Sequence, residues 1–353
     1  MQYHNRIIEL LKHRVKDNMS DEIDWKGLSA NRNAISILEQ NIDKIHWKKL
    51  SGNPNAISIL EKNQDKIHWY NLCGNPNGIS ILEKNIDKID WPNLSYNPDA
   101  ISILEKNQDK INWGCLSYNP NAISILEKNS DKIHWRGLSA NPNAISILEK
   151  NKDKINWIYL SSNPNAISIL KNNIDKIDWR ELSGNPNAIS ILENNIDKID
   201  WRQLSGNPNA ISILEKNQDK THWLQLYSNP NAVCLCLSSN SNANSILENN
   251  IDRVYWEIFC SNPNAIRILE NYIDEIIWHS LSWNPNAISI LEKNTDKIYW
   301  YNLCSNEGVS ELNYQWLKER MDIIREDLMK AVYHPRRLKY YFEHYECDIF
   351  EEN

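Results

Sequence analysis

The fold is decided by the segment DKIHWYNLCGNPNGISILEKN, residues 65–85, because near-copies of it fill most of the chain. Its tryptophan recurs every 22 residues, resumes after one step of 33 residues, and marks thirteen repeats. A fixed period between about 20 and 50 residues is typical of solenoids, whose repeats bury their apolar faces only against neighbouring repeats. The tryptophans, which we expect to form the structural core, are Trp25, Trp47, Trp69, Trp91, Trp113, Trp135, Trp157, Trp179, Trp201, Trp223, Trp256, Trp278 and Trp300.

Each repeat contains an Asn-Pro pair that is typical of a helix start. In the second repeat, Asn53 can cap a helix, and Pro54 is tolerated at the first helical position because its missing N–H would have no partner there. Eleven of the thirteen prolines occupy this position. We predict a helix from Pro54 to about Lys62, ended by Asn63 in the left-handed conformation.

A second helix start lies before each tryptophan, where Asp, His or Asn recurs. Asp90 precedes Trp91, and aspartate is a preferred N-cap. Pro92 directly follows; deep inside a helix it would cost about 3 kcal/mol, but it is tolerated in a first turn. We therefore predict a short helix that begins at each tryptophan, as from Trp69 to about Cys73.

These patterns predict an all-α fold, an α-solenoid of either hand with about thirteen two-helix repeats of 22 residues and helical caps at both ends. We predict an N-terminal capping helix at 1–20, the solenoid at 21–306 and a C-terminal helical cap at 307–353. The 33-residue step predicts an irregular half-repeat near 228–250, with a kink or change of pitch near 237–244. We expect a rod or superhelix on the order of 100 Å long.

A leucine-rich repeat is the alternative interpretation, because LSxNPNAI echoes its strand-and-turn motif. That repeat needs apolar residues two positions before and five after the leucine, where this chain has Tyr70 and Asn77. The prolines and the helical periodicity therefore favour helices.

The chain carries 39 basic and 46 acidic residues, dispersed along the repeats, for a formal net charge of −7. This balance favours solubility and argues against a polyanionic partner. The seven cysteines show no metal-ligand spacing, so we expect reduced thiols, no metal and no cofactor. The first residues lack the apolar stretch and cleavage site of a signal peptide, and no segment is typical of a membrane span.

The units WxxLSxNPNAIxILEKNxDKI and the closing KAVYHPRRLKYYFEHYECDI resemble the proteins with roughly 22-residue repeats that giant DNA viruses of amoebae encode. The resemblance covers nearly the whole chain. It implies a viral protein that takes part in a host–virus interaction, located in the host cytoplasm or in the virion, and it transfers no catalytic residue. Arg32 in place of proline and the irregularity near 240 depart from the pattern and put strict superhelical regularity in doubt.

The positions that vary within the fixed frame are the two residues after each tryptophan and the residue before each Asn-Pro. Exposed aromatic side chains beside arginine are typical of protein-binding hot spots, whereas neutral drift on solvated positions is the alternative. We predict a partner-binding edge on the side of the short helices. Its candidate residues are Tyr70, Tyr96, Tyr118, Arg136, Tyr159, Arg180, Arg202 and Trp283.

Other recurring polar residues have a functional and a structural interpretation. In the functional interpretation, the Asp65–Lys66 pair and its equivalents bind an acidic or phosphate-bearing partner. In the structural one, the aspartate caps its turn and the lysine pairs with a glutamate such as Glu61. Histidines such as His46 can bind a metal or cap a helix. The Ser58 series has no base in register to make it a nucleophile. The structural interpretation is favoured in each case.

The leading functional prediction is a non-enzymatic repeat scaffold for protein–protein interaction, with a protein partner. The alternative is a modular nucleic-acid-binding protein that reads one nucleotide per repeat. That function needs a basic channel, and the variable pair is basic in only some repeats. An enzyme is not expected, because the sequence has no glycine-rich phosphate loop, metal cluster or nucleophile–base constellation.

Overall fold

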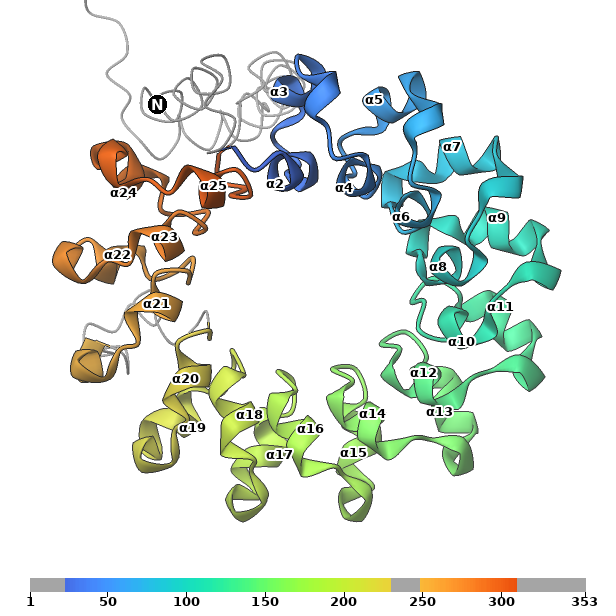
Figure 1. Ribbon diagram of the computed structural model, residues 1–353. Coiled ribbons are helices and arrows are strands. Elements are labelled where there is room, and N and C mark those ends of the chain that lie inside the picture. The colour runs from blue at the N-terminus through green and yellow to red at the C-terminus, as the bar shows by residue number, and fades with distance from the viewer. Residues whose placement is uncertain (1–22, 230–247, 310–353) are drawn as a thin grey trace, which may run out of the picture. The chain divides into compact units, whose positions relative to one another are not determined.

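The computed structural model describes residues 23–229 and 248–309, which are helices joined by turns and contain no strand. The chain divides into two compact units, Met1–Val309 and Ser310–Asn353, and every described residue belongs to the first. The predicted all-α solenoid of helix pairs is confirmed in these residues (Figure 1). The predicted caps at 1–20 and 307–353 lie outside the described residues, apart from 307–309.

The first helix of each repeat, called here the Trp helix, begins at the tryptophan as predicted. The side chain before it caps the first turn: Asp90 Oδ1 accepts a hydrogen bond from Asn93 N at 2.9 Å, and His134 Nδ1 accepts one from Gly137 N at 3.3 Å. The helix stops at an extended residue, such as Asn97 at φ −72° and ψ 117°. The Trp helices are α2 (Trp25–Ala30), α4 (Trp47–Ser51), α6 (Trp69–Cys73), α8 (Trp91–Tyr96), α10 (Trp113–Leu116), α12 (Trp135–Ala140), α14 (Trp157–Ser162), α16 (Trp179–Gly184), α18 (Trp201–Gly206), α20 (Trp223–Leu226), α21 (Trp256–Phe259), α23 (Trp278–Leu281) and α25 (Trp300–Leu303).

The helix that follows the Asn-Pro pair, called here the second helix of the repeat, begins three residues later than predicted. Pro54 opens a separate turn in which Ala56 N donates to Asn53 O at 3.1 Å, and the α-helix starts at Ile57. The prediction was wrong because Ala56, at φ −93° and ψ 10°, takes a bridge conformation that interrupts the helix. The second helices are α3 (Ile35–Glu39), α5 (Ile57–Lys62), α7 (Ile79–Glu83), α9 (Ile101–Lys106), α11 (Ile123–Lys128), α13 (Ile145–Lys150), α15 (Ile167–Lys171), α17 (Ile189–Glu193), α19 (Ile211–Lys216), α22 (Ile266–Leu269) and α24 (Ile288–Lys293), and the preceding turn is itself a 3₁₀ helix at η4 (Pro76–Gly78) and η6 (Pro98–Ala100).

A 3₁₀ turn leads from the second helix to the next repeat. Asn63 is not left-handed as predicted but lies at φ −133° and ψ 51°. Its side-chain amide donates to Ile59 O at 2.9 Å, which satisfies a carbonyl at the helix end by another route. These turns are η2 (Ile42–Lys44), η3 (Gln64–Lys66), η5 (Ile86–Lys88), η7 (Gln108–Lys110), η8 (Ser130–Lys132), η9 (Lys152–Lys154), η10 (Ile174–Lys176), η11 (Ile196–Lys198), η12 (Gln218–Lys220), η15 (Glu248–Arg253), η16 (Ile273–Glu275) and η17 (Thr295–Lys297).

The core of each repeat is aliphatic and comes from all three of its helical turns. In the repeat of α5, the side chains of Leu50, Ala56, Ile59, Leu60 and Ile67 are at most 7% exposed. Burying one such leucine or isoleucine contributes about 1.5–3 kcal/mol. The buried side chains of successive repeats form one continuous cluster through the described residues.

A buried asparagine in each repeat joins it to the preceding repeat. Asn53 is 2% exposed, and its Nδ2 donates to Ser29 O at 3.2 Å and to Asn31 O at 3.0 Å. Its Oδ1 accepts from Asn55 N at 3.0 Å, so the amide is fully paired. Because an unpaired buried polar group costs about 1–3 kcal/mol, these bonds constrain how repeats stack. Equivalent pairs of bonds to the preceding repeat are made by Asn75, Asn97, Asn119, Asn141, Asn163, Asn185, Asn207, Asn229, Asn262, Asn284 and Asn306.

Two further hydrogen bonds recur between neighbouring repeats. Ser51 Oγ accepts from His68 N of the next repeat at 2.9 Å. On the outside of the junction, Asn55 Nδ2 donates to Arg32 O of the preceding repeat at 2.9 Å. Each junction thus combines apolar packing with a fixed set of polar contacts.

The stack of repeats curves toward its Trp helices. Consecutive Trp helices such as α12, α14 and α16 pack directly on one another, whereas consecutive second helices such as α11 and α13 lie farther apart. A stack whose units approach on one side and separate on the other is curved. The Trp helices accordingly lie on the inner side of the array and the second helices on the outer side (Figure 1).

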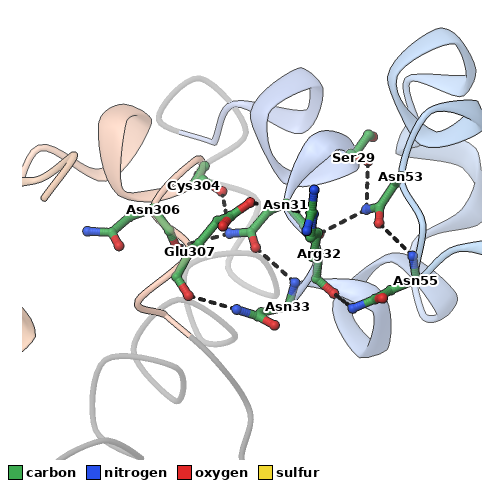
Figure 2. Close-up of polar contacts among 9 residues, drawn as sticks. All are labelled: Ser29, Asn31, Arg32, Asn33, Asn53, Asn55, Cys304, Asn306 and Glu307. Carbon is green, nitrogen blue, oxygen red and sulfur yellow. Dashed lines mark hydrogen bonds and ion pairs between the residues drawn. The ribbon is translucent and has the colours of Figure 1, made fainter. Parts of the chain in front are cut away.

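The curved array closes on itself (Figure 2). Asn31 of the first repeat donates through Nδ2 to Cys304 O and Asn306 O of the last repeat, both at 3.1 Å. Asn33 Nδ2 donates to Glu307 O at 2.7 Å. These are the bonds that join any two neighbouring repeats, so the repeats form a closed ring. The expected rod or superhelix is wrong, because the curvature brings the first and last repeats into contact.

The asparagine bonds continue across the irregular tryptophan spacing. Asn262 donates to Tyr227 O at 2.9 Å and to Asn229 O at 3.4 Å, 35 and 33 residues away in sequence instead of the usual 24 and 22. The repeats on either side are therefore neighbours joined by the usual pair of asparagine bonds. The predicted half-repeat near 228–250 and kink near 237–244 fall largely on 230–247, outside the described residues.

Candidate functional site

Most of the variable residues of the Trp helices lie away from the core. In α6, Leu72 and Cys73 are fully buried, whereas Tyr70 is 57% exposed and Asn71 is half-buried. At the end of α8, Tyr96 is 48% exposed. We call the two residues after each tryptophan and the residue before each buried asparagine the variable surface.

The variable surface is continuous from repeat to repeat. Asn93 Nδ2 donates to Tyr70 O of the preceding repeat, and Asn302 Nδ2 donates to His279 O at 2.7 Å. In both cases the second residue after one tryptophan contacts the first residue after the preceding tryptophan. Neighbouring repeats can therefore build a common site from their variable residues.

Four predicted site residues, on four successive repeats, form one chain of contacts. The rings of Tyr96 and Tyr118 lie 5.8 Å apart between centroids. Tyr118 packs beside Gly137, the residue after Arg136 in the chain, and contributes in a minor way to the raised pKa of Arg136. The Arg136 guanidinium lies over the Tyr159 ring, 4.5 Å from its centroid, and donates a hydrogen bond to its hydroxyl. We call Tyr96, Tyr118, Arg136 and Tyr159 the tyrosine–arginine cluster.

The cluster holds one fixed positive charge among neutral phenols. The hydrogen bond to Tyr159, followed by its electrostatic attraction, raises the pKa of Arg136 above its ordinary value. Partial burial raises the pKa of the Tyr96 hydroxyl, with smaller contributions from Cys115 and Tyr118. Near neutral pH the arginine is therefore charged and Tyr96 is uncharged.

The other predicted edge residues are exposed but lie apart from the cluster. Arg180 in α16 and Arg202 in α18 occupy the position that Arg136 has in α12. Tyr70 meets the ring of His68 edge-on at 6.4 Å, and Trp283 is 46% exposed. In the described residues, 23–229 and 248–309, none of these four side chains contacts the tyrosine–arginine cluster.

Several exposed apolar residues were not among the predicted site residues. Tyr255 and Tyr299 precede their tryptophans, at the position that Asp, His or Asn holds in most repeats, and this departure was the signal available in the sequence. The rings of Tyr299 and His279 lie 5.8 Å apart. The exposed residues that the prediction missed are Ile158, Leu224, Tyr255, Tyr272, Tyr299 and Tyr301.

The tryptophans lie at the edge of the core, and most of them contact a cation from the 3₁₀ turn that leads to the next repeat. All thirteen pack against the core; Trp300 is buried and the other twelve are half-buried. Lys154 lies over the ring of Trp135, with Nζ 4.9 Å from the centroid. Such lysines were predicted to pair with a glutamate, but they face the indole of the Trp helix that precedes them instead. The same contact is made by Lys66, Lys110, Lys132, Lys176, Lys198, Lys220, Arg253 and Lys297.

The remaining polar residues singled out by the sequence lie in structural positions. His46 Nδ1 accepts from Lys49 N at 3.3 Å and so caps α4, and Ser58 is exposed on α5. In the part of the chain that the structure describes, no three His, Cys, Asp or Glu side chains lie close enough together to hold a metal ion. The same part contains no helix of the length and apolarity that a membrane span requires.

No protein-family model, curated protein or solved structure matches the chain. Function is therefore inferred from the variable surface itself.

The variable surface has a different charge balance from the whole chain. The two residues after each tryptophan include six basic and two acidic side chains, although acidic residues outnumber basic ones in the chain. All six basic side chains are exposed. They are Lys26, Lys48, Lys49, Arg136, Arg180 and Arg202, and the acidic ones are Glu181 and Glu257.

Proposed function

We propose that the protein is a non-enzymatic scaffold that binds a partner protein through its variable surface. The observation that supports this function is the tyrosine–arginine cluster, whose side chains touch one another and are at least partly exposed. Tyrosine, tryptophan and arginine dominate binding hot spots because they combine a large contact area with hydrogen-bonding groups. Contacts already made in the free protein restrict their rotamers, so less conformational entropy is lost on binding.

The repeat frame suits such a role, because it holds different side chains at equivalent places. The buried asparagine, the serine after the repeat leucine and the aliphatic core recur, while the variable surface changes from repeat to repeat. The sequence resemblance to repeat proteins of giant DNA viruses supports a viral origin, with action in the host cytoplasm or in the virion. The partner in that case is a host or viral protein.

Binding to the full-length chain tests this function. We would compare the proteins retained by the wild type with those retained by an Arg136→Ala/Tyr159→Ala variant. The matched control is Glu127→Ala/Lys128→Ala, which removes two exposed side chains from α11 on the outer side of the array. The proposal expects a protein that the wild type and the control retain and the cluster variant loses. If no retained protein depends on these side chains, the proposal fails.

Nucleic-acid binding is the second candidate, and the excess of basic side chains on the variable surface favours it. A repeat protein can read single-stranded nucleic acid with two or three side chains per repeat. Binding of this kind weakens steeply with salt, because neutralised phosphates release counterions. Salt-dependent retention of RNA or DNA that Arg136→Ala and Arg180→Ala reduce would favour this function over the scaffold.

A further inference from the structure

The junction between the last and the first repeat, called here the seam, is built like the other junctions. Asn31 and Asn33 make the same bonds to Cys304, Asn306 and Glu307 that their counterparts make elsewhere (Figure 2). Burial raises the pKa of the Cys304 thiol and the nearby N–H of Asp24 lowers it, so Asp24 lies beside this thiol as Asp90 lies beside Cys73. The seam is therefore built like a repeat junction rather than a chance contact.

The seam differs from the other junctions in one covalent respect. At every other junction the polypeptide passes from one repeat into the next, and this tether keeps separated repeats at a high effective concentration. At the seam only non-covalent contacts join the two repeats. Opening there is opposed by the contacts alone, so the seam separates more readily than a tethered junction with the same contacts.

The seam also differs in its residues. Arg32 and Glu307 stand at the position that proline holds in the other eleven repeats, and Arg32 Nε lies 3.9 Å from Glu307 Oε1. The two ends thus carry opposite charges at the position where the other repeats have proline.

We propose that the two ends of the array are matched recognition surfaces that pair within one chain, and that the ring opens at this seam in preference to its other junctions. Charge complementarity carries the matching, since Arg32 and Glu307 are the two non-proline residues at that position and they meet each other. Opening gives a large partner a route to the inner side of the array, where the Trp helices lie. The inference concerns the free protein and does not depend on the proposed function.

Three buried cysteines report on this opening in the unmodified chain. Cys73, Cys260 and Cys304 occupy the same position in three repeats and are fully buried. The thiols of Cys73 and Cys260 accept hydrogen bonds from the N–H groups of Asp90 and Ile277 at internal junctions, whereas Cys304 lies at the seam. We would expose the folded full-length protein to iodoacetamide and follow each cysteine by mass spectrometry. Each thiol reacts when its own junction opens.

The proposal expects Cys304 to react about tenfold faster than the other two, because the tether that speeds reclosing is absent at the seam. Equal or slower reaction of Cys304 would show that the seam opens no more readily than a tethered junction, and would overturn the proposal. The salt dependence is a second readout. Higher salt should accelerate Cys304 and leave Cys73 and Cys260 unchanged, since it screens the exposed Arg32–Glu307 pair.

Two variants test the recognition step separately from opening. Arg32→Glu places two carboxylates face to face, and we expect the reaction of Cys304 to rise about threefold, with no change at Cys260. Arg32→Pro restores the residue of the other repeats and serves as the matched control, with a smaller rise. If both variants behave alike, charge does not carry the recognition.

Sedimentation of the wild type should show a monomer at all accessible concentrations, and a concentration-dependent dimer would overturn pairing within one chain.

Discussion

Asn31 donates to Asn306 O across 275 residues of sequence in the same way that Asn53 donates to Asn31 O across 22 residues. Both bonds come from an amide that is buried and paired on all sides. The hydrogen-bond series of the solenoid therefore has no free end in the described residues. Closure replaces two exposed end faces with one more junction, which is how a repeat array avoids leaving apolar ends in water.

Replacing Asn31 with alanine should destabilise the seam selectively. The change leaves two buried carbonyls, those of Cys304 and Asn306, without this donor, at a cost of about 1–3 kcal/mol. We expect native-state alkylation of Cys304 to rise by about fivefold to a hundredfold, because 1.4 kcal/mol corresponds to a factor of ten. Mass spectrometry of the labelled cysteines measures the rate.

The matched control for that experiment is Asn284→Ala. Asn284 donates to Cys260 O and Asn262 O at 2.9 and 2.7 Å, so it makes the same two bonds at a tethered junction. We expect this variant to accelerate Cys260 by a similar factor, because the same two bonds are lost, but from a slower starting rate. Cys260 in Asn284→Ala should therefore react more slowly than Cys304 in Asn31→Ala, and the reverse order would contradict the special status of the seam.

The caps of the Trp helices should matter for stability, whereas the variable residues beside them should not. Asp178 Oδ1 accepts from Glu181 N at 2.9 Å and caps α16. We expect Asp178→Ala to lower the free energy of unfolding by about 1 kcal/mol, a typical loss for an N-cap. Arg180→Ala, in the same helix, should change it by less than about 0.5 kcal/mol because the side chain is exposed. Urea unfolding measures both values, and a larger effect of the arginine would show that the variable surface is structural.

The repeat period and the Trp helices could be predicted because their signals are local. Pro92 directly follows Trp91, and a proline is tolerated in the first turn of a helix but not in its interior. The helix must therefore begin near Trp91, with Asp90 as its cap. The start of the second helix was misplaced for the opposite reason. Asn53 and Pro54 signal a turn, but the ψ angle of the third residue decides whether that turn continues into a helix, and sequence does not fix this angle.

Ring closure was not predictable, because it depends on a small angle between repeats that accumulates over the whole array. The sequence did contain a trace of it, since Arg32 and Glu307 replace proline in the first and last repeats. The candidate site shows a similar division. Tyr118, Arg136 and Trp283 were predicted by the same criterion, an aromatic residue or arginine at a variable position. The placement of neighbouring repeats, which this criterion does not include, determines that Tyr118 and Arg136 lie together and that Trp283 lies apart.

The contact between Trp135 and Lys154 should be measurable as a coupling between repeats. Trp135→Ala removes a large half-buried ring, and we expect a loss of about 2–4 kcal/mol, less than for a fully buried tryptophan. Lys154→Ala should cost about 0.5–1 kcal/mol, the range of an exposed cation–π contact. In a double-mutant cycle the two losses should not add, because the lysine loses its partner with the ring. Additive losses would show that the contact contributes nothing to stability.

Alkaline pH should destabilise the fold through its buried thiols. Burial raises the pKa of Cys73 from 9.0 to about 11 and that of Cys304 to about 12. The folded state thus keeps protons that the unfolded state has lost. The contribution of these thiols to stability is complete below pH 9 and disappears as the pH rises through the folded values.

The variant that isolates this effect is Cys73→Ser/Cys304→Ser. Serine holds the same position in most repeats, where its hydroxyl makes the bonds that Ser51 makes, and it does not ionise in this range. We expect the wild type and the variant to unfold at similar urea concentrations at neutral pH. At about pH 10 the variant should be the more stable of the two, because its side chains release no protons on unfolding. Parallel loss of stability in both proteins above pH 9 would mean that the thiols do not control the alkaline limit.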